Sequence, residues 1–203
     1  TVELYGGRIL RKGLRLNNSI VLGDLLPRKA GLAYYREGSD TQLTLKEAAS
    51  KTCDLVVKLC SHGGKNGFDG TNCPYCNAPA VAEAALNDDE GNLLQQRFAD
   101  LQTALDADRD GGAEFTLLAD VTGDYTIDGK QNTGLDLNGH SIKGTVTVKG
   151  IKGDYITTTL SNTQNTTTAS IDKVVACDGA ELAGSKYPAV IGELTLAEGA
   201  TWK

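Results

Sequence analysis

Alternation of apolar and polar residues over runs of about four to eight residues dominates the chain. The run "GTVTVKG" shows it most clearly, because Val146 and Val148 share one face while Thr145, Thr147 and Lys149 share the other. Glycine, asparagine and aspartate separate the runs, as in turns between short β-strands. The pattern predicts a mainly β protein.

Two all-β architectures contain strands of this kind, the parallel β-helix and the β-sandwich. Few of the runs are joined by two-residue hairpin turns, and "LDLNGHSI", "GTVTVKG" and "GELTLAEGATWK" look like variants of one rung. We therefore predict parallel β-helix-like segments. The alternative is a pair of β-sandwich-like domains.

One helix and one strand pair interrupt this pattern. In "FADLQTALDADRDGG", Asp100 is a candidate N-cap, and Gly111 and Gly112 would end the helix. Its apolar stripe consists of Leu101, Ala104 and Leu105. The preceding "VAEAALNDDEGNLLQQRF" predicts two strands flanking a turn. Such a group suits an end cap, because an uncovered β-helix end exposes apolar side chains and unpaired backbone groups.

These elements predict four consecutive regions. We expect a β-helical segment over residues 1–59, a Cys/His zinc knuckle over 60–77, a strand–helix cap over 78–113, and a second β-helical segment over 114–203.

Charge and composition exclude two classes of partner. The net charge is −6 and no lysine-rich block occurs, so a basic nucleic-acid-binding surface is not expected. No apolar run approaches the roughly 20 residues of a membrane-spanning helix, so we expect no membrane insertion. The chain begins at Thr1 and contains no methionine. We expect it to be a processed piece of a larger chain.

The order of the short helix, "FTLLADVTGDYTIDGKQNTGLDLNGHSI" and glycine-bounded rungs resembles the cap and first coils of β-helix repeat modules. Such modules belong to secreted, wall-attached surface proteins of gut and oral Gram-positive bacteria, and the upstream "CSH…CPYC" resembles their Cys/His connectors. One departure is Gly134, which replaces the apolar residue usual before the LDLNG core. The resemblance implies an extracellular, cell-surface location and a role as spacer, adhesin or binder of a host protein or glycan.

The stretch "CSHGGKNGFDGTNCPYC" carries the strongest chemical signal. Cys60, His62, Cys73 and Cys76 offer three thiolates and one imidazole, a donor set that binds zinc tetrahedrally. Glycines in the intervening loop allow it to fold back around an ion. All four positions would be occupied by protein, which predicts a structural zinc site rather than a catalytic one.

Disulfides and metal-free reduced thiols are the alternatives for this cluster. The extracellular setting implied by the resemblance would permit disulfides. The five cysteines are an odd number, and a metal site at the cluster leaves Cys53 and Cys177 separate. A thioredoxin-like role for "CPYC" is not expected, because the βαβ context is missing.

A catalytic triad is the first enzymatic possibility, because His140 lies close to Asp136 and Ser141. Triads gather their members from separate elements, whereas these residues share one strand and its turn. We interpret His140 as a residue of the rung end.

Paired carboxylates are the second possibility, because β-helices often carry polysaccharide lyases and hydrolases. Aspartate is also favoured in turns for its bonds to the backbone, and we prefer that interpretation. The candidates are Asp120, Asp124, Asp128, Asp136, Glu193 and Glu198. We assign no catalytic residue and no cofactor-binding residue outside the metal cluster. The sequence thus predicts a non-enzymatic surface module, with a fragment of a carbohydrate-active enzyme as the alternative.

Overall fold

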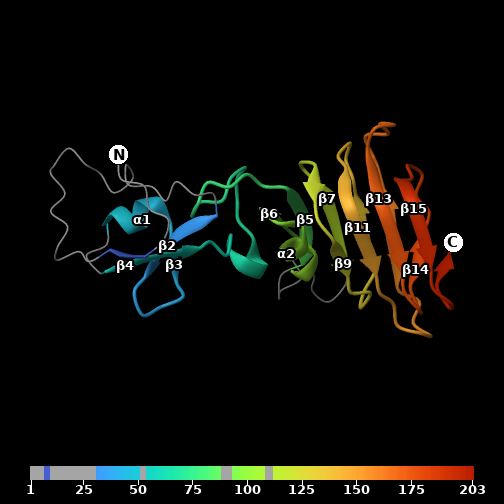
Figure 1. Cartoon of the computed structure of the whole chain (residues 1–203), viewed down its shortest axis with the longest axis horizontal. Coiled ribbons are helices and arrows are strands. Elements are labelled where there is room, and N and C mark those ends of the chain that lie inside the picture. The colour runs from blue at the N-terminus through green and yellow to red at the C-terminus, as the bar shows by residue number, and fades with distance from the viewer. Residues whose placement is uncertain (1–6, 10–30, 51–53, 88–92, 108–111) are drawn as a thin grey trace. The chain divides into compact units, whose positions relative to one another are not determined.

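The computed structural model describes residues 7–9, 31–50, 54–87, 93–107 and 112–203. Contacts divide the chain into two units, Thr1–Pro79 and Ala80–Lys203 (Figure 1). Unit 1 contains β1 (Gly7–Ile9), β2 (Leu32–Arg36), β3 (Gln42–Leu43), α1 (Leu45–Ser50), β4 (Leu55–Leu59) and the 3₁₀ helix η2 (Gly64–Asn66). Unit 2 contains β5 (Ala82–Asn87), β6 (Leu93–Phe98), α2 (Leu101–Asp106), β7 (Ala113–Leu117), β8 (Val121–Thr122), β9 (Tyr125–Ile127), β10 (Thr133–Asp136), β11 (Ile142–Val148), β12 (Thr157–Ser161), β13 (Ser170–Ala176), β14 (Glu181–Ala183), β15 (Val190–Leu196) and β16 (Thr201–Trp202).

Unit 1 is built on a four-stranded sheet with the order β1-β4-β2-β3. All three pairings in this sheet are antiparallel. Strand β2 is the most buried, since Leu32 to Tyr35 are all shielded from solvent, and α1 packs against β2 and β3. Helix α1 begins where it does because Thr44 and Glu47 form a capping box, in which each side chain accepts a hydrogen bond from the other residue's backbone N–H.

This sheet corrects one expectation. We expected residues 1–59 to form parallel β-helical rungs, but the described strands of that region pair antiparallel. The run "TQLTLKEA" has strand-like alternation only at its start, because the capping box turns the chain into α1 after Leu43. The predicted boundaries of the four regions are not tested by this finding.

Unit 2 is a parallel β-solenoid of about four turns. Each turn places one strand in a sheet ordered β16-β14-β12-β10-β7-β5-β6, and another in a sheet ordered β15-β13-β11-β8, with β9 also paired to β11. All pairings between the strands from β7 to β16 are parallel. Strands β11, β13 and β15 follow one another side by side in Figure 1. The predicted mainly β fold with a parallel β-helix is confirmed, and the β-sandwich alternative is wrong for this unit.

The core of the solenoid consists of columns of inward-facing side chains, one residue from each turn. In one column Tyr125, Val146 and Val174 lie in register and are buried. Val146 and Val148 both point into the core, as their alternation predicts. Gly134 instead lies in register with Glu114, and a β-carbon at Gly134 would come within 1.9 Å of that carboxylate. Glycine at this position leaves room for the Glu114 side chain.

The N-terminal end of the solenoid is capped. Helix α2 begins at the predicted N-cap Asp100, whose carboxylate accepts a bond from Thr103 N at 2.8 Å, and its predicted stripe is buried. The helix packs against β9, where the Gln102 side-chain amide bonds both the N–H and the C=O of Thr126. The predicted strand pair, β5 and β6, extends the other sheet by antiparallel pairing of β5 with β7. Helix α2 ends at Asp106, ahead of the predicted stop at Gly112. Gly111 lies outside the described residues.

Within the described part of the chain, no helix is both long and apolar enough to cross a membrane.

Candidate metal centre

Two turns of unit 1 bring the four predicted ligands together. The first turn follows β4, where Cys60 N donates to Gly31 O at 2.6 Å and His62 adopts a positive φ of 50°. Gly63 continues the left-handed turn with a φ of 84°, and a β-carbon there would lie 2.0 Å from Gly67 O. The chain can therefore reverse tightly behind His62 because position 63 has no side chain.

The second turn carries Cys73 and Cys76. Cys73 N donates to Ala78 O, and Asn77 N donates to Cys73 O, each at 2.8 Å. An antiparallel bridge between Asn72 and Pro79 closes the base of the turn. These bonds present both sulfur atoms from one tight loop, as a Cys-x2-Cys pair in a zinc knuckle does.

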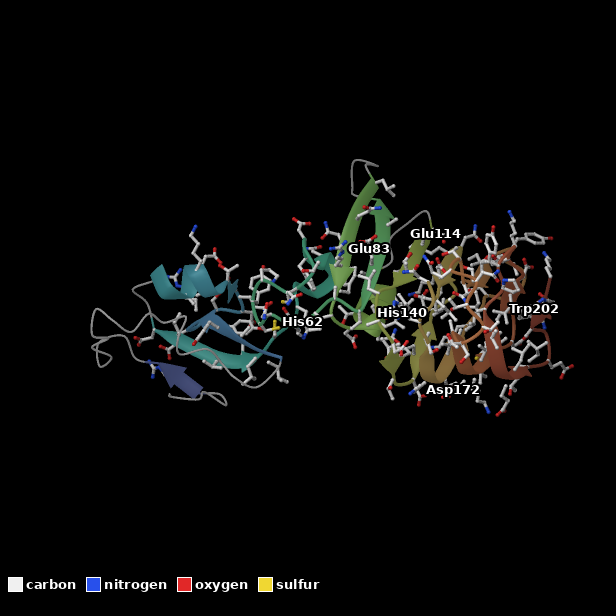
Figure 2. All side chains as sticks on the ribbon, turned by 90° about the horizontal axis from the view of Figure 1, so that it is seen from above. His62, Glu83, Glu114, His140, Asp172 and Trp202 are labelled. Carbon is white, nitrogen blue, oxygen red and sulfur yellow. The ribbon has the colours of Figure 1, made fainter. Side chains whose placement is uncertain are left out.

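The four ligand atoms lie close enough together to hold one metal ion. They all lie within 4.8 Å of one another, and Figure 2 shows His62 next to cysteine sulfur. Cys60 Sγ and Cys73 Sγ are 3.8 Å apart, and Cys76 Sγ and His62 Nδ1 are 3.3 Å apart. Zn–S bonds of about 2.3 Å and Zn–N bonds of about 2.0 Å in a tetrahedron require separations of about 3.8 Å and about 3.5 Å. The Cys/His cluster predicted from the sequence is thus assembled, and it could hold a metal ion.

Burial and charge favour a cation at the cluster. Cys73 is 2% exposed and Cys60 is 9% exposed, while His62 and Cys76 are half-buried. Burial raises the pKa of Cys60, and the neighbouring Cys73 and Cys76 raise it further. Burial is also the largest cause of the raised pKa of Cys76. The raised pKa values of Cys60 and Cys76 oppose their ionisation, and a bound metal ion would supply the positive charge that favours the thiolate form.

The cluster also has partners outside the predicted set. Gln42 Nε2, on β3, donates to Cys60 Sγ at 2.9 Å, and His62 N donates to the same sulfur at 3.3 Å. The Ser61 hydroxyl donates to Gln42 Oε1, which orients the amide with its NH₂ group toward the sulfur. Sequence reasoning missed Gln42, because its distance along the chain from Cys60 carries no signal of contact.

The disulfide alternative finds no support among the cysteines that the structure describes. Cys60, Cys73, Cys76 and Cys177 are free thiols, and the separation of 3.8 Å between Cys60 and Cys73 far exceeds an S–S bond of about 2.05 Å. Cys53 lies outside the described residues, so its pairing stays untested.

The triad candidates of unit 2 do not converge. His140 Nδ1 lies 3.6 Å from Asp120 Oδ1 rather than beside Asp136. The Ser141 hydroxyl donates to Thr168 O and accepts from Ser170 N. Its oxygen thus links its own coil to the next.

The aspartates of the first coils bond the backbone, as their turn positions predict. Asp120 Oδ1 accepts from Ser141 N at 2.9 Å, and Asp124 Oδ1 accepts from Thr145 N at 2.8 Å. Both bonds link one coil to the next over 21 residues. Asp128 accepts from Lys130 N within its own turn. Glu193, in the last coil, pairs with Lys173 at 2.6 Å.

Comparison with protein-family models, with curated proteins and with solved structures finds no match for this chain. The fold and the cluster by themselves define the class, a β-solenoid protein with a candidate Cys₃His metal centre in a separate unit.

Proposed function

We propose that the chain is a non-enzymatic module of a bacterial cell-surface protein, with a structural zinc ion in unit 1. The observation that carries the metal proposal is the close approach of four protein ligand atoms, from Cys60, His62, Cys73 and Cys76. With all four positions filled by protein, zinc would have no open site for water or substrate. Its free energy of binding would instead stabilise the glycine-rich loop, which has little apolar surface besides Phe68.

The solenoid would then act as a spacer or as a surface that binds a host protein or glycan. Two observations support a scaffold role. The turn aspartates that could have formed a catalytic group are engaged in bonds between coils, and the columns of buried side chains make a rigid stack. Residence on the bacterial surface rests on the sequence resemblance alone.

The metal proposal is tested by elemental analysis of the protein purified without reductant, together with thiol counting under denaturing, non-reducing conditions. We expect about one zinc per chain and five reactive thiols. Cys76→Ser should lose the metal, whereas Cys177→Ser, which removes a free thiol outside the cluster, should keep it. Protein without zinc in the presence of excess metal, or equal zinc content in both variants, would contradict the proposal.

The surface proposal needs a separate test. Antibody labelling of intact and lysed source cells would separate surface display from an internal location. A glycan array and a panel of extracellular host proteins would then be screened with the zinc-loaded chain. Labelling that appears only after lysis would refute the surface role.

A carbohydrate-active enzyme is the second candidate, and one electrostatic interaction between carboxyl groups favours it. Glu114 and Asp136 lie on the outer face of neighbouring coils, and burial together with the negative charge of Asp136 raises the pKa of Glu114. A carboxyl of raised pKa beside a second carboxylate is typical of a general acid. Release of sugar products from a panel of polysaccharides, lost in Glu114→Gln, would establish this alternative and exclude the non-enzymatic module.

A further inference from the structure

The last turn of the solenoid exposes side chains that every earlier turn buries. Leu194 lies in register with the fully buried Val174 but is 40% exposed, and Leu196 lies in register with buried Ala176 but is 45% exposed. In the other sheet Trp202 lies in register with buried Leu182 and is 46% exposed. These residues continue the inward-facing columns, so their exposure results from the lack of a covering coil among the described residues.

The last strands at this end also form the edges of both solenoid sheets. Strands β15 and β16 are the last members of their sheets, paired with β13 and β14 and with no described strand on the other side. An edge strand presents unpaired N–H and C=O groups that can pair with another strand. The seven residues of β15 make it one of the longest strands of the solenoid.

The two ends of the solenoid differ in this respect. At the N-terminal end α2 covers β9, and the Gln102 amide satisfies the backbone N–H and C=O of Thr126. No comparable helix or side-chain amide covers β15 or β16 among the described residues. The two ends of the solenoid therefore differ in how their apolar columns are covered among the described residues.

We propose that this surface, which we name the open end and define by Ile191, Leu194, Leu196 and Trp202, docks a further parallel β-solenoid coil. Parallel stacking is the pairing that every preceding turn uses. The last turn advances by 20 residues in both sheets, because Ser170 faces Val190 and Glu181 faces Thr201. The docked coil therefore places apolar residues over the open end. It belongs to a segment whose strands repeat about every 20 residues.

The charges on the outer face further limit which coil can dock at the open end. On the outer face Lys173 and Glu193 lie in register and form an ion pair at 2.6 Å. A coil with a cation above Glu193 continues this alternation. A twofold contact between the open ends of two copies, centred on β15, would instead place Glu193 opposite its equivalent, and like charges directly opposite destabilise a sheet. A copy stacked head to tail meets the α2 cap. The occupant is thus a coil from another solenoid segment and not a second copy of this chain.

The experiment uses Trp202 as its reporter, because it is the only tryptophan in the chain. A copy of residues 184–203 is appended directly after Lys203, with Trp202→Phe and Glu193→Lys made only within the copy. We expect the emission of the native Trp202 to shift to shorter wavelength, its quenching by acrylamide to fall several-fold, and the unfolding midpoint of the solenoid to rise. A control extension also carries Leu194→Asp and Leu196→Asp within the copy and should leave Trp202 emission and quenching unchanged.

Two results would overturn the proposal. One is that the emission and quenching of the native Trp202 are the same with and without the extension that lacks the two aspartate substitutions. The other is a dimer of the unextended chain in light scattering in which Trp202 is already protected from acrylamide, since the open end would then bind a second copy.

Discussion

Asp136 joins two coils through a single carboxylate, and its removal gives a quantitative test of how the solenoid is stabilised. Asp136 Oδ1 accepts from Asn138 N and from Thr163 N, each at 2.9 Å, and its Oδ2 accepts from the Thr163 hydroxyl. The bond to Asn138 shapes the turn after β10, and the bonds to Thr163 reach 27 residues ahead to the next coil. We expect Asp136→Ala to weaken both the turn after β10 and the link to the next coil.

The magnitude follows from the three bonds. A hydrogen bond to a charged group contributes about 1.5–3 kcal/mol when buried and less when exposed to water. Thr163 is exposed and Asp136 is half-buried, so about 1 kcal/mol for each bond is appropriate. Asp136→Ala should therefore lower the free energy of unfolding by about 2–3 kcal/mol. Asp136→Asn keeps an acceptor oxygen without the charge and should cost about half as much.

Urea denaturation, followed by the far-ultraviolet signal, measures these differences. Asp172→Ala is the matched control, because that carboxylate lies exposed on β13 and bonds no described residue, so its loss should change stability by less than about 0.5 kcal/mol. The reasoning is refuted when Asp136→Ala is as stable as the unmodified chain, or when Asp172→Ala is destabilised equally.

Three further predictions concern single side chains. Gln42→Leu should weaken cobalt binding and shift the sulfur-to-cobalt charge-transfer band while all four ligands remain, because it removes an N–H donor to Cys60 Sγ; identical spectra and affinities would contradict this. Glu114→Gln should stabilise the solenoid increasingly as the pH rises from 4 to 7, because a carboxyl whose folded pKa is raised loses stability as pH passes through that value; a pH-independent difference in urea midpoints would count against it. Gly129→Ala should destabilise far more than Gly153→Ala, since both have positive φ but only at position 129 does a β-carbon strike backbone, at 1.9 Å; equal thermal shifts would show the contact to be unimportant.

Sequence reasoning predicted the solenoid because its signal is local. A strand buried on one face alternates, and Val146 and Val148 carry that alternation whatever their neighbours are. The Asp100 cap was equally readable, since N-capping depends on residues within one turn of helix. The metal cluster was predicted because both halves of the ligand set lie in one short stretch.

Features that depend on pairing partners were not predictable in the same way. Alternation is the same in parallel and antiparallel strands, so the antiparallel sheet of unit 1 could not be distinguished from rungs. The contact of Gln42 with Cys60 exists only because β3 pairs with β2, which in turn pairs with β4. Gly134 looked like a defect in a rung, yet it faces the Glu114 side chain of the neighbouring coil, a relation set by register across 20 residues.

The connections between strands differ in length while the columns of the core stay in register. Residues 149–156 and 162–169 each join two strands with eight residues, whereas 177–180 needs only four. The extra residues are exposed to solvent beside the stacked strands. Tyr155 in the first connection is 88% exposed, and residues 163–168 of the second are exposed throughout. Lengthening such a connection costs little, because loop-closure entropy grows only slowly with length. Evolution, or a protein engineer, can therefore graft a recognition peptide into the first connection, or into the second beyond Thr163, without redesigning the rungs, and can vary specificity independently of folding.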